Sequence, residues 1–421
     1  KERHIFDTFK IRGSYGEIGQ SNIERYAYLQ SYNLEERGYY IGGQWMPGFS
    51  EGGLVSKDIS WYSVKDMNIG IDFGSLNNRL SGSIDYFRKV TTGYLASPSN
   101  VNYTAPLGTA LPYVKTNGEH IRQGLDFIIQ WKEERAGWKY GISVNLTYFD
   151  AFYNINPFES EADLKNPYKR TTQAKGYWGI GYECEGFYRD QEDIINSPIR
   201  QGSVNLGAGD LKYKDINGDG IIDENDKTNI GSPLPKWTFG WNNTFRYKNF
   251  DLNIFINGSV GAKVANYLNM KMTHMNSPWS NQLKDVNKRV HLVAKDGNQT
   301  GNWYDNISNL TVDNPNSMYP RASINDPNDN DAFSDRYIED GSYLRLKSMA
   351  LGYTFDQKLI QKIGLTNLRL TLTASNLFTI TGYSGYDPEV GLSTQSANVY
   401  GLDFGRYPSP TTVTFGLNLS F

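Results

Sequence analysis

Long stretches of this chain alternate apolar and polar residues with a period of two, which predicts β-strands that have one apolar and one polar face. In the clearest stretch, residues 138–148, every even-numbered residue is large and apolar. The same alternation recurs in residues 237–247 and 413–421. Such runs reach about ten residues, which is longer than a usual globular strand and close to the length that crosses a bilayer at a tilt.

The alternation predicts an all-β protein with ten strands, which cover residues 8–18, 60–74, 79–91, 118–133, 137–149, 236–248, 250–260, 341–356, 366–380 and 411–421. Between them, short turns alternate with the long connections 19–59, 92–117, 150–235, 261–340 and 381–410. Short turns at one rim and long loops at the other are typical of outer-membrane β-barrels, whereas a soluble sandwich has shorter strands. If the short turns are periplasmic, the segments 150–235 and 261–340 are long extracellular loops.

Aromatic residues gather near the predicted strand ends, as in Trp61 with Tyr62 and Trp131 with Trp138. At a membrane interface such rings lie at headgroup level, although aromatic packing of a β-core explains any single pair equally well. Repetition on both sides of several short turns favours interfacial girdles.

The overall composition excludes several classes of protein. The 42 Lys and Arg residues against 45 Asp and Glu give a net charge of −3, so no basic field indicates a nucleic-acid partner. The single cysteine, Cys184, excludes an internal disulfide framework. No apolar run approaches the roughly 20 residues of a membrane helix, and the first residues have no signal-peptide pattern. A membrane location stays open, because only alternate residues of a membrane β-strand face lipid.

One motif indicates a metal ion. Residues 215–226 place oxygen-bearing side chains at positions 1, 3, 5, 9 and 12 of a twelve-residue loop, with Gly220 at the sharp turn of position 6. This spacing predicts bound Ca²⁺. An acidic turn built on Asn-Gly and Asp-Gly is the alternative, and Asp226 stands where the usual pattern has the longer Glu. The predicted ligands are Asp215, Asn217, Asp219, the carbonyl of Ile221, Asp223 and Asp226.

We expect this ion to be structural, because one ion can replace the hydrophobic core that the polar segment 150–235 lacks. A second polar and turn-rich segment, 322–335, matches no ligand spacing. We therefore expect a solvated loop there.

Three groups of motifs resemble one family. The first is Gly-Asp-Leu-Lys-Tyr-Lys at 209–214, followed by the cation turn and by residues 230–240. The second is Tyr-Ile-Glu-Asp-Gly-Ser-Tyr-Leu-Arg-Leu-Lys at 337–347, and the third is Gly-Tyr-Asp-Pro-Glu-Val at 385–390 with the terminal strand. Together they resemble the C-terminal part of SusC/RagA-type TonB-linked outer-membrane transporters of the Bacteroidetes. The hairpin at 68–87 is similar to theirs as well.

The resemblance implies a 22-stranded transmembrane antiparallel β-barrel preceded by a plug, of which residues 1–421 are the C-terminal part. We expect the N-terminal plug and the earlier strands to lie outside this chain, because an open ten-stranded sheet in lipid leaves two unpaired edges at prohibitive cost. The aromatic Phe421 fits the terminal residue that the barrel-assembly machinery reads in this class.

By resemblance, the whole protein is a multi-pass outer-membrane importer of oligosaccharides or peptides. A SusD-like surface lipoprotein closes over it, and TonB with ExbB and ExbD drives it through the plug. The resemblance also leaves open a dimer of transporter–lipoprotein pairs. Ring faces suit sugars, so the substrate-binding candidates are the loop tryptophans Trp45, Trp178, Trp279 and Trp303. Packing within the loops or against the lipoprotein is the alternative for each.

Two other functions compete with transport. One is a secreted, calcium-stabilised β-rich protein that binds glycans or acts as an adhesin. The other is an enzyme, but no signature places a catalytic pair of carboxylates. The histidines His4, His120, His274 and His291 show neither metal-ligand nor triad spacing. The sequence therefore predicts no catalytic residues and no enzyme.

Overall fold

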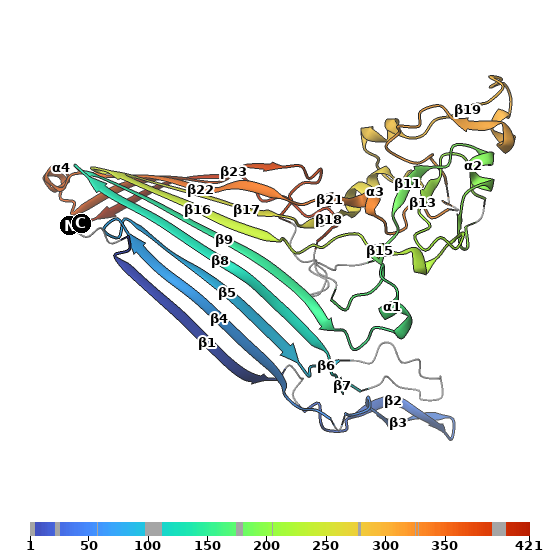
Figure 1. Ribbon diagram of the computed structural model, residues 1–421, viewed down its shortest axis with the longest axis horizontal. Coiled ribbons are helices and arrows are strands. Elements are labelled where there is room, and N and C mark those ends of the chain that lie inside the picture. The colour runs from blue at the N-terminus through green and yellow to red at the C-terminus, as the bar shows by residue number, and fades with distance from the viewer. Residues whose placement is uncertain are drawn as a thin grey trace. The chain divides into compact units, whose positions relative to one another are not determined.

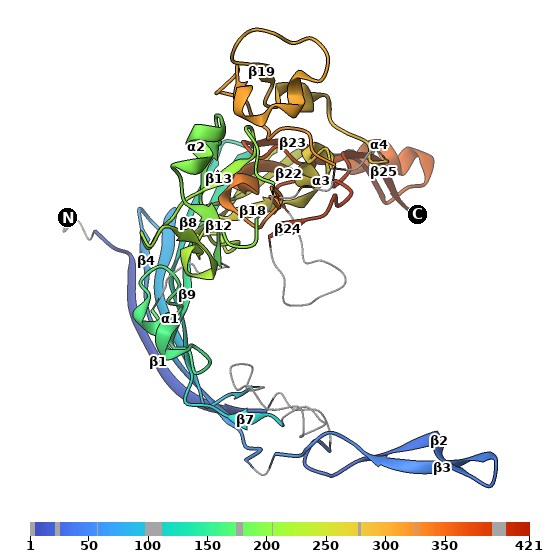
Figure 2. The same cartoon turned by 90° about the vertical axis from the view of Figure 1, so that its right-hand side faces the viewer.

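The computed structural model describes residues 5–21, 26–56, 58–96, 112–173, 180–203, 205–276, 279–324, 326, 328–389 and 401–421. Its main feature is one ten-stranded sheet (Figures 1 and 2). In spatial order its strands are β1 (Thr8–Gln20), β4 (Tyr62–Ser75), β5 (Leu80–Thr92), β8 (Glu119–Arg135), β9 (Trp138–Ile155), β16 (Trp237–Tyr247), β17 (Phe250–Val260), β22 (Tyr343–Thr354), β23 (Asn367–Thr381) and β25 (Thr412–Ser420). The ten predicted strands are therefore confirmed.

The chain forms two compact units. The first comprises residues 1–74, 82–127 and 149–175, and the second comprises residues 75–81, 128–148 and 176–421. The division at residue 175 falls inside the predicted loop 150–235. The first part of that loop continues β9 to Ile155 and contains the short helix α1 (Glu161–Lys165).

The two faces of the sheet differ in chemistry. The register places Trp241 of β16 opposite Val144 of β9, and Phe245 opposite Tyr140. Trp241 is 41% exposed, Phe245 37% and Leu417 of β25 56%. A half-buried antiparallel sheet in water covers its apolar side. An apolar face that stays open is therefore typical of a wall that faces lipid.

The opposite face carries ion pairs that link strands. In the first unit, the Arg12 guanidinium of β1 lies 2.7 Å from the Asp72 carboxylate of β4 and 3.0 Å from Asp85 of β5. In the second unit, Arg369 of β23 pairs with Asp251 of β17 at 2.6 Å. Charges placed at alternate positions in this way require a wet or protein-filled interior on this side of the sheet.

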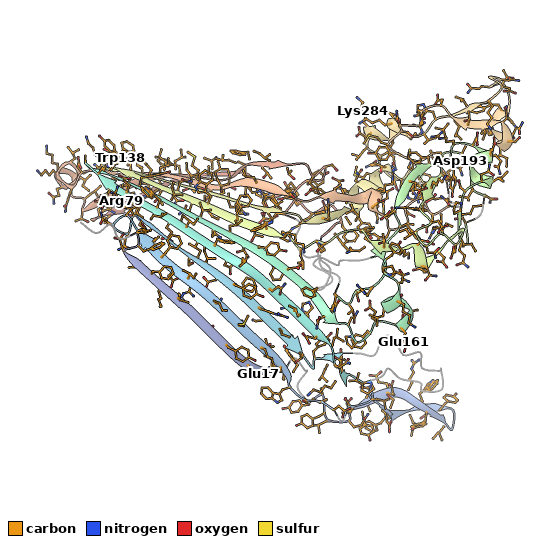
Figure 3. The ribbon with its side chains drawn as sticks, in the orientation of Figure 1. Glu17, Arg79, Trp138, Glu161, Asp193 and Lys284 are labelled. Atoms are coloured by element: carbon orange, nitrogen blue, oxygen red, sulfur yellow. The ribbon has the colours of Figure 1, made fainter. Side chains whose placement is uncertain are left out.

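The short turns adopt the backbone that tight turns require. Leu76, Asn77 and Asn78 all have positive φ between β4 and β5. Trp138 and Arg79 lie at the end of the sheet that carries these turns (Figure 3). The last short connection is helical, with α4 (Gln357–Ile360) and the 3₁₀ turn η7 (Gln361–Ile363).

The remaining described elements lie outside the ten-stranded sheet. The first unit adds the hairpin of β2 (Tyr32–Ile41) and β3 (Gln44–Glu51) and the pair β6 (Leu95–Ala96) and β7 (Val114–Lys115). The second unit adds β10 (Ile180–Gly181), β11 (Cys184–Phe187), α2 (Gln191–Ile195), β12 (Ile199–Arg200), β13 (Leu211–Tyr213), β14 (Ile221–Ile222), η2 (Glu224–Asp226), β15 (Thr228–Asn229), β18 (Lys263–Asn266), α3 (Tyr267–Thr273), η3 (Lys284–Lys288), β19 (Leu292–Ala294), η4 (Trp303–Asp305), η5 (Ile307–Asn309), β20 (Leu310–Val312), η6 (Asp335–Tyr337), β21 (Ile338–Asp340) and β24 (Leu402–Asp403).

We call the described residues of 180–235 and 262–341 the loop module. They share a hydrophobic core, in which Tyr182, Leu211, Tyr213, Ile222 and Ala332 are buried together. The expectation that the 150–235 segment lacks a core is therefore wrong. Its few apolar residues are scattered along the sequence, but strand pairs such as β11 with β13 bring them together.

The segment 322–335 is also not the solvated loop that its composition predicts. Asn328, Asn330 and Ser334 are each 1% exposed. The burial of the two asparagines is tolerated because their amide groups bond the backbone of Leu211. Within the described residues, no helix is both long and apolar enough to span a membrane.

Candidate functional site

The predicted cation turn lies between β13 and β15 and is organised by its own carboxylates. The Asp215 carboxylate accepts hydrogen bonds from the backbone N–H groups of Gly218 at 2.7 Å and Gly220 at 2.8 Å. Both glycines have positive φ, 76° and 88°, which a side chain would disfavour. The sharp turn that the spacing predicts at Gly220 is therefore present.

The last predicted ligand, Asp226, is completely buried. Its carboxylate accepts from the backbone N–H groups of Ile216, Asn217 and Asp223 at 2.9, 3.2 and 2.8 Å. This side chain closes the turn from the inside, and its shortness relative to Glu suits that buried position. Ile222, which is fully buried, anchors the same turn in the core of the loop module.

The other predicted ligands lie on the exposed side of the turn. The Asn217 side-chain oxygen accepts from the Asp219 N–H at 2.8 Å, and Asp219 accepts from the Ile221 N–H at 2.9 Å. Asp223 caps η2 by accepting from Asn225. Each of these oxygens keeps further lone pairs, so the turn can offer oxygen ligands to a hard cation.

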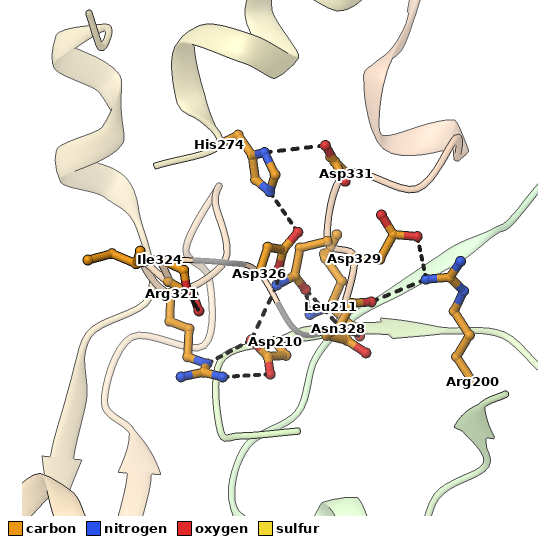
Figure 4. A network of polar contacts seen from close by, with 12 residues as sticks. Arg200, Asp210, Leu211, His274, Arg321, Ile324, Asp326, Asn328, Asp329 and Asp331 are labelled. Atoms are coloured by element: carbon orange, nitrogen blue, oxygen red, sulfur yellow. Dashed lines mark hydrogen bonds and ion pairs between the residues drawn. The ribbon is translucent and has the colours of Figure 1, made fainter. Parts of the chain in front are cut away.

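A tighter cluster of titratable groups lies elsewhere in the loop module (Figure 4). The His274 ring is 7% exposed and lies between two carboxylates, with Nε2 2.7 Å from Asp326 Oδ2 and Nδ1 3.4 Å from Asp331 Oδ2. Their ligand atoms all lie within 4.8 Å of one another. Because each ring nitrogen faces a carboxylate, the arrangement suits an imidazolium that bridges two anions rather than a ring that gives a lone pair to a metal.

The pKa of His274 reflects this setting. Burial disfavours the charged ring, but the hydrogen bond to Asp326 and the charges of Asp331 and Asp326 outweigh it, so the pKa is raised above its usual value. The sequence shows no signal for this cluster, because His274 is far from both aspartates along the chain and no short motif contains the three residues.

A second buried pair joins Asp210 of the first motif to Arg321, in the 262–341 part of the loop module. The Asp210 carboxylate is completely buried, and Arg321 donates to it from Nε at 2.7 Å and from Nη2 at 2.9 Å. Asn330 donates to the same carboxylate at 3.3 Å. Such bidentate geometry is the strong form of an Arg–carboxylate contact. It explains why an acidic residue follows Gly209 in this motif.

A third cluster joins the second motif to the third. Arg345 of β22 is 3% exposed and donates to Asp387 and, at 2.7 Å, to Glu389. Lys347, two residues further along the strand, also contacts Glu389 at 3.0 Å. Sequence reasoning used these motifs for recognition only. The available signal for their contact was that the second motif ends in two cations, Arg345 and Lys347, whereas the third contains two anions, Asp387 and Glu389.

The predicted tryptophans are placed as follows. Trp45 lies on β3, 54% exposed, with its ring 5.1 Å from that of Tyr40. Trp303 begins η4 and packs edge-on against Tyr304 at 6.2 Å. Trp279 is 94% exposed, and Trp178 lies outside the described residues. The two ring contacts involve neighbouring tyrosines and not another of the four tryptophans, so a shared substrate site stays a prediction.

Known proteins were compared with this chain. No family model matches it. TonB-dependent receptor P3 of Formosa agariphila is 28% identical over an alignment of 437 residues, which covers 100% of this chain and 40% of that protein. TonB-dependent receptor SusC of Bacteroides thetaiotaomicron is 27% identical over 442 residues, again 100% of this chain but 38% of the relative. The solved RagAB peptide importer in its open-open state matches with a TM-score of 0.69 at 20% identity, over 99% of this chain and 40% of that chain.

The fold is therefore that of a TonB-dependent transporter barrel, an all-β architecture with a large antiparallel sheet. The recognition from the sequence motifs is confirmed as well: along its whole length the chain is similar to TonB-dependent receptors of the SusC/RagA type. It spans 40% or less of the length of the two curated relatives described above.

Proposed function

We propose that this chain forms part of the wall and the outer loops of an outer-membrane, TonB-dependent nutrient importer of the SusC type. The observation that carries the proposal is the open apolar face of the sheet, exemplified by Trp241 and Leu417, opposite a face of ion-paired charges such as Arg369 with Asp251. A wall with lipid on one side and a wet interior on the other requires this division. The whole-length likeness to TonB-dependent receptors supports the same function.

The importer needs more chain than these residues supply. β1 and β25 stand at the two ends of the sheet order. In lipid their unpaired backbone groups would each cost several kcal/mol. We propose that earlier strands of the same transporter pair with both edges and that its plug receives force from TonB, ExbB and ExbD.

The proposed partner outside the cell is a SusD-like surface lipoprotein. The β2–β3 hairpin supports such a partner, because its large side chains are open on both faces: Tyr39 is 57% exposed and the next residue, Tyr40, on the other face, 62%. An isolated two-stranded hairpin is marginally stable in water, so a covering surface would stabilise it. Pairing of two transporter–lipoprotein units is part of the same proposal.

The proposed cargo is an oligosaccharide, with a peptide as the competing class because RagAB is a peptide importer. The exposed rings of Trp45 and Trp279 suit the C–H faces of sugars. Trp178 and Trp303 complete the proposed set of aromatic contacts. A binding and transport role requires no catalytic residue, and the curated relatives carry receptor names.

Calcium is proposed as a structural ion at the turn 215–226, held by Asp215, Asn217, Asp219, the Ile221 carbonyl, Asp223 and Asp226. The support is the preformed turn, in which Gly218 and Gly220 already adopt the left-handed backbone. The ion would neutralise the acidic turn and hold it against the core of the loop module through Ile222.

The function is tested in a cell that makes the complete transporter. The protein should fractionate with the outer membrane and migrate differently in detergent gels before and after heating, as folded barrels do. Growth on the cargo should depend on TonB. A protein recovered only in the medium or the soluble fraction would contradict the proposal and would favour the secreted glycan-binding alternative.

A further inference from the structure

A pocket of about 600 Å³ lies in the first unit, on the face of the sheet that carries Arg12, Asp72 and Asp85. Most of its lining residues come from the ends of β1, β5 and β9 and from the starts of β4 and β8. Alternate residues of adjacent strands face it, for example Tyr62 of β4 and Lys89 of β5. The pocket therefore belongs to the interior side of the wall and not to the lipid side.

Cationic groups dominate the charge of this pocket. Lys89 and Arg122 line it together with the ring of His120, and the Lys115 ammonium lies beside it, 2.9 Å from the Ser60 hydroxyl. Lys89 has a counter-ion in Asp66 at 3.3 Å. Arg122 is exposed, and within the part of the chain that the structure describes no carboxylate pairs with it. An anion entering the pocket would therefore meet an unneutralised guanidinium.

Aromatic and amide groups form the rest of the recognition surface. The rings of His120 and Tyr153 pack edge to face at 4.8 Å, and the Tyr62 hydroxyl donates to the Gln20 side chain at 3.0 Å. The Tyr94 phenol occupies the space over Gly118, where a side chain would meet its hydroxyl at 2.5 Å. These contacts fix the positions of three tyrosines before any ligand binds.

This mixture of groups distinguishes between ligand classes. Among the described lining residues, the aliphatic ones are Val64 and Leu95. A pocket for an apolar peptide side chain would be lined mostly by such residues. Tyrosine rings and side-chain amides suit instead a ligand that offers C–H faces and hydroxyl groups. Arg122 adds the planar donor fork that matches a carboxylate or a sulfate.

We propose that this pocket binds the anionic group of an acidic oligosaccharide, a uronate carboxylate or a sulfate ester, with Arg122 as the specificity-determining residue. The inference rests on the importer function proposed above and adds the substrate class. Lys89 and Lys115 contribute a favourable field around the same group, and the tyrosines hold the adjoining sugar rings. Because the charges are partly open to solvent, the interaction weakens as salt rises.

The test uses the complete transporter purified in detergent and titrated calorimetrically with four probes of similar length: an oligogalacturonate, a sulfated galactan oligosaccharide, a neutral galacto-oligosaccharide and an acidic hexapeptide. The variants are Arg122→Gln, the charge-retaining Arg122→Lys and, as a matched control, Lys358→Gln at the exposed helix α4. Each variant must show the heat-modifiable migration of a folded barrel.

The inference predicts that at least one acidic oligosaccharide binds and the neutral one binds more weakly, and that Arg122→Gln weakens the acidic ligand about tenfold. Arg122→Lys should keep part of the affinity, and Lys358→Gln all of it. The probe that binds better identifies carboxylate or sulfate as the recognised group. Equal affinity for the neutral oligosaccharide, binding of the peptide alone, or an unchanged Arg122→Gln protein would each overturn it.

Measurements of growth on the cargo and of outer-membrane location distinguish a wrong pocket assignment from a wrong importer function. If Arg122→Gln changes nothing while the cells still grow on their cargo in a TonB-dependent manner, only the substrate class is wrong. If the complete transporter does not reach the outer membrane, the importer function itself is wrong.

Discussion

Arg345 of β22 and Asp387 form an ion pair between residues 42 positions apart, with side chains 3% and 11% exposed. Glu389 and the Thr379 hydroxyl take two further hydrogen bonds of the same guanidinium, at 2.7 and 2.8 Å. The pair holds the segment that follows β23 against β22. Two motifs that identify the family are therefore one physical contact.

Breaking this pair should be costly. Asp387→Asn removes the more buried of the two carboxylates that pair with the Arg345 guanidinium. Complete loss of a buried counter-charge destabilises by about 3–5 kcal/mol, and because Glu389 stays in place we expect a loss near the lower end of that range. We expect a lower yield of folded barrel. We also expect the folded form in detergent gels to unfold at a lower temperature. Arg345→Met together with Asp387→Leu removes both charges of the pair. This double variant should therefore be more stable than Asp387→Asn alone. Lys347→Gln, at a more exposed pair, should shift the same measurement by about 1 kcal/mol or less.

If Ca²⁺ at the turn 215–226 is structural, removing the ion or its ligands should make the loop module more sensitive to protease. Asp215→Asn combined with Asp219→Asn removes two exposed carboxylates, so the loop module should be cleaved faster, and a chelator should have the same effect on the unaltered protein. At a Ca²⁺ concentration of about 100 times Kd, bound ion stabilises by about 2.7 kcal/mol. Limited proteolysis with mass mapping measures this. Glu224→Gln, outside the ligand positions, is the matched control, and unchanged cleavage with chelator and in the double variant would refute a structural ion.

His274 predicts a pH dependence of the loop module. Its pKa is raised above the usual 6.5, since the hydrogen bond to Asp326 and the nearby carboxylates outweigh burial. A raised histidine pKa adds stability that is fully present below the unfolded value and is lost as pH rises through the folded value. Hydrogen exchange of residues 328–334 should therefore accelerate beyond the intrinsic rate as the pH rises above about 6.5. In His274→Gln this extra acceleration should disappear. If the acceleration persists in that variant, another titrating group causes it.

The two faces of β16 predict opposite responses to the same substitution. Trp241→Arg places a charge on the apolar face, which costs about 2–4 kcal/mol at the bilayer midplane and less near the interfaces. Asn242→Arg, on the next residue and the other face, should be tolerated. Outer-membrane yield of heat-modifiable protein measures both. Equal yields of the two variants would mean that the apolar face does not meet lipid.

The long strands could be predicted from the sequence because every second residue reports which face it occupies. The loop module could not, because its strands are two to four residues long and carry no readable period. Its core residues Tyr182 and Tyr213 each lie between small or charged neighbours in the sequence, so composition alone suggested a loop without a core. Pairs such as Asp210 with Arg321, 111 positions apart, follow no local spacing rule.

The segment 322–335 shows why polar composition misled. Asn330 bonds the backbone N–H of Leu211 at 2.7 Å and the carboxylate of Asp210 at 3.3 Å. Buried amides of this kind replace water as partners for the backbone. Their sequence resembles that of a solvated turn, and only the tertiary contacts distinguish the two.

The central claim, that this sheet is a membrane wall, is tested most directly by site-directed spin labelling along β16 in the complete transporter. The native Cys184, whose burial raises the pKa of its thiol to about 12, is first changed to serine. Single cysteines are then placed at each position of 237–247, and accessibility to oxygen and to a water-soluble nickel complex is measured in outer membranes. We predict a period of two, with oxygen favoured at odd positions such as 241 and 245 and nickel at the even ones. Uniform access of the nickel complex to both faces would contradict the claim.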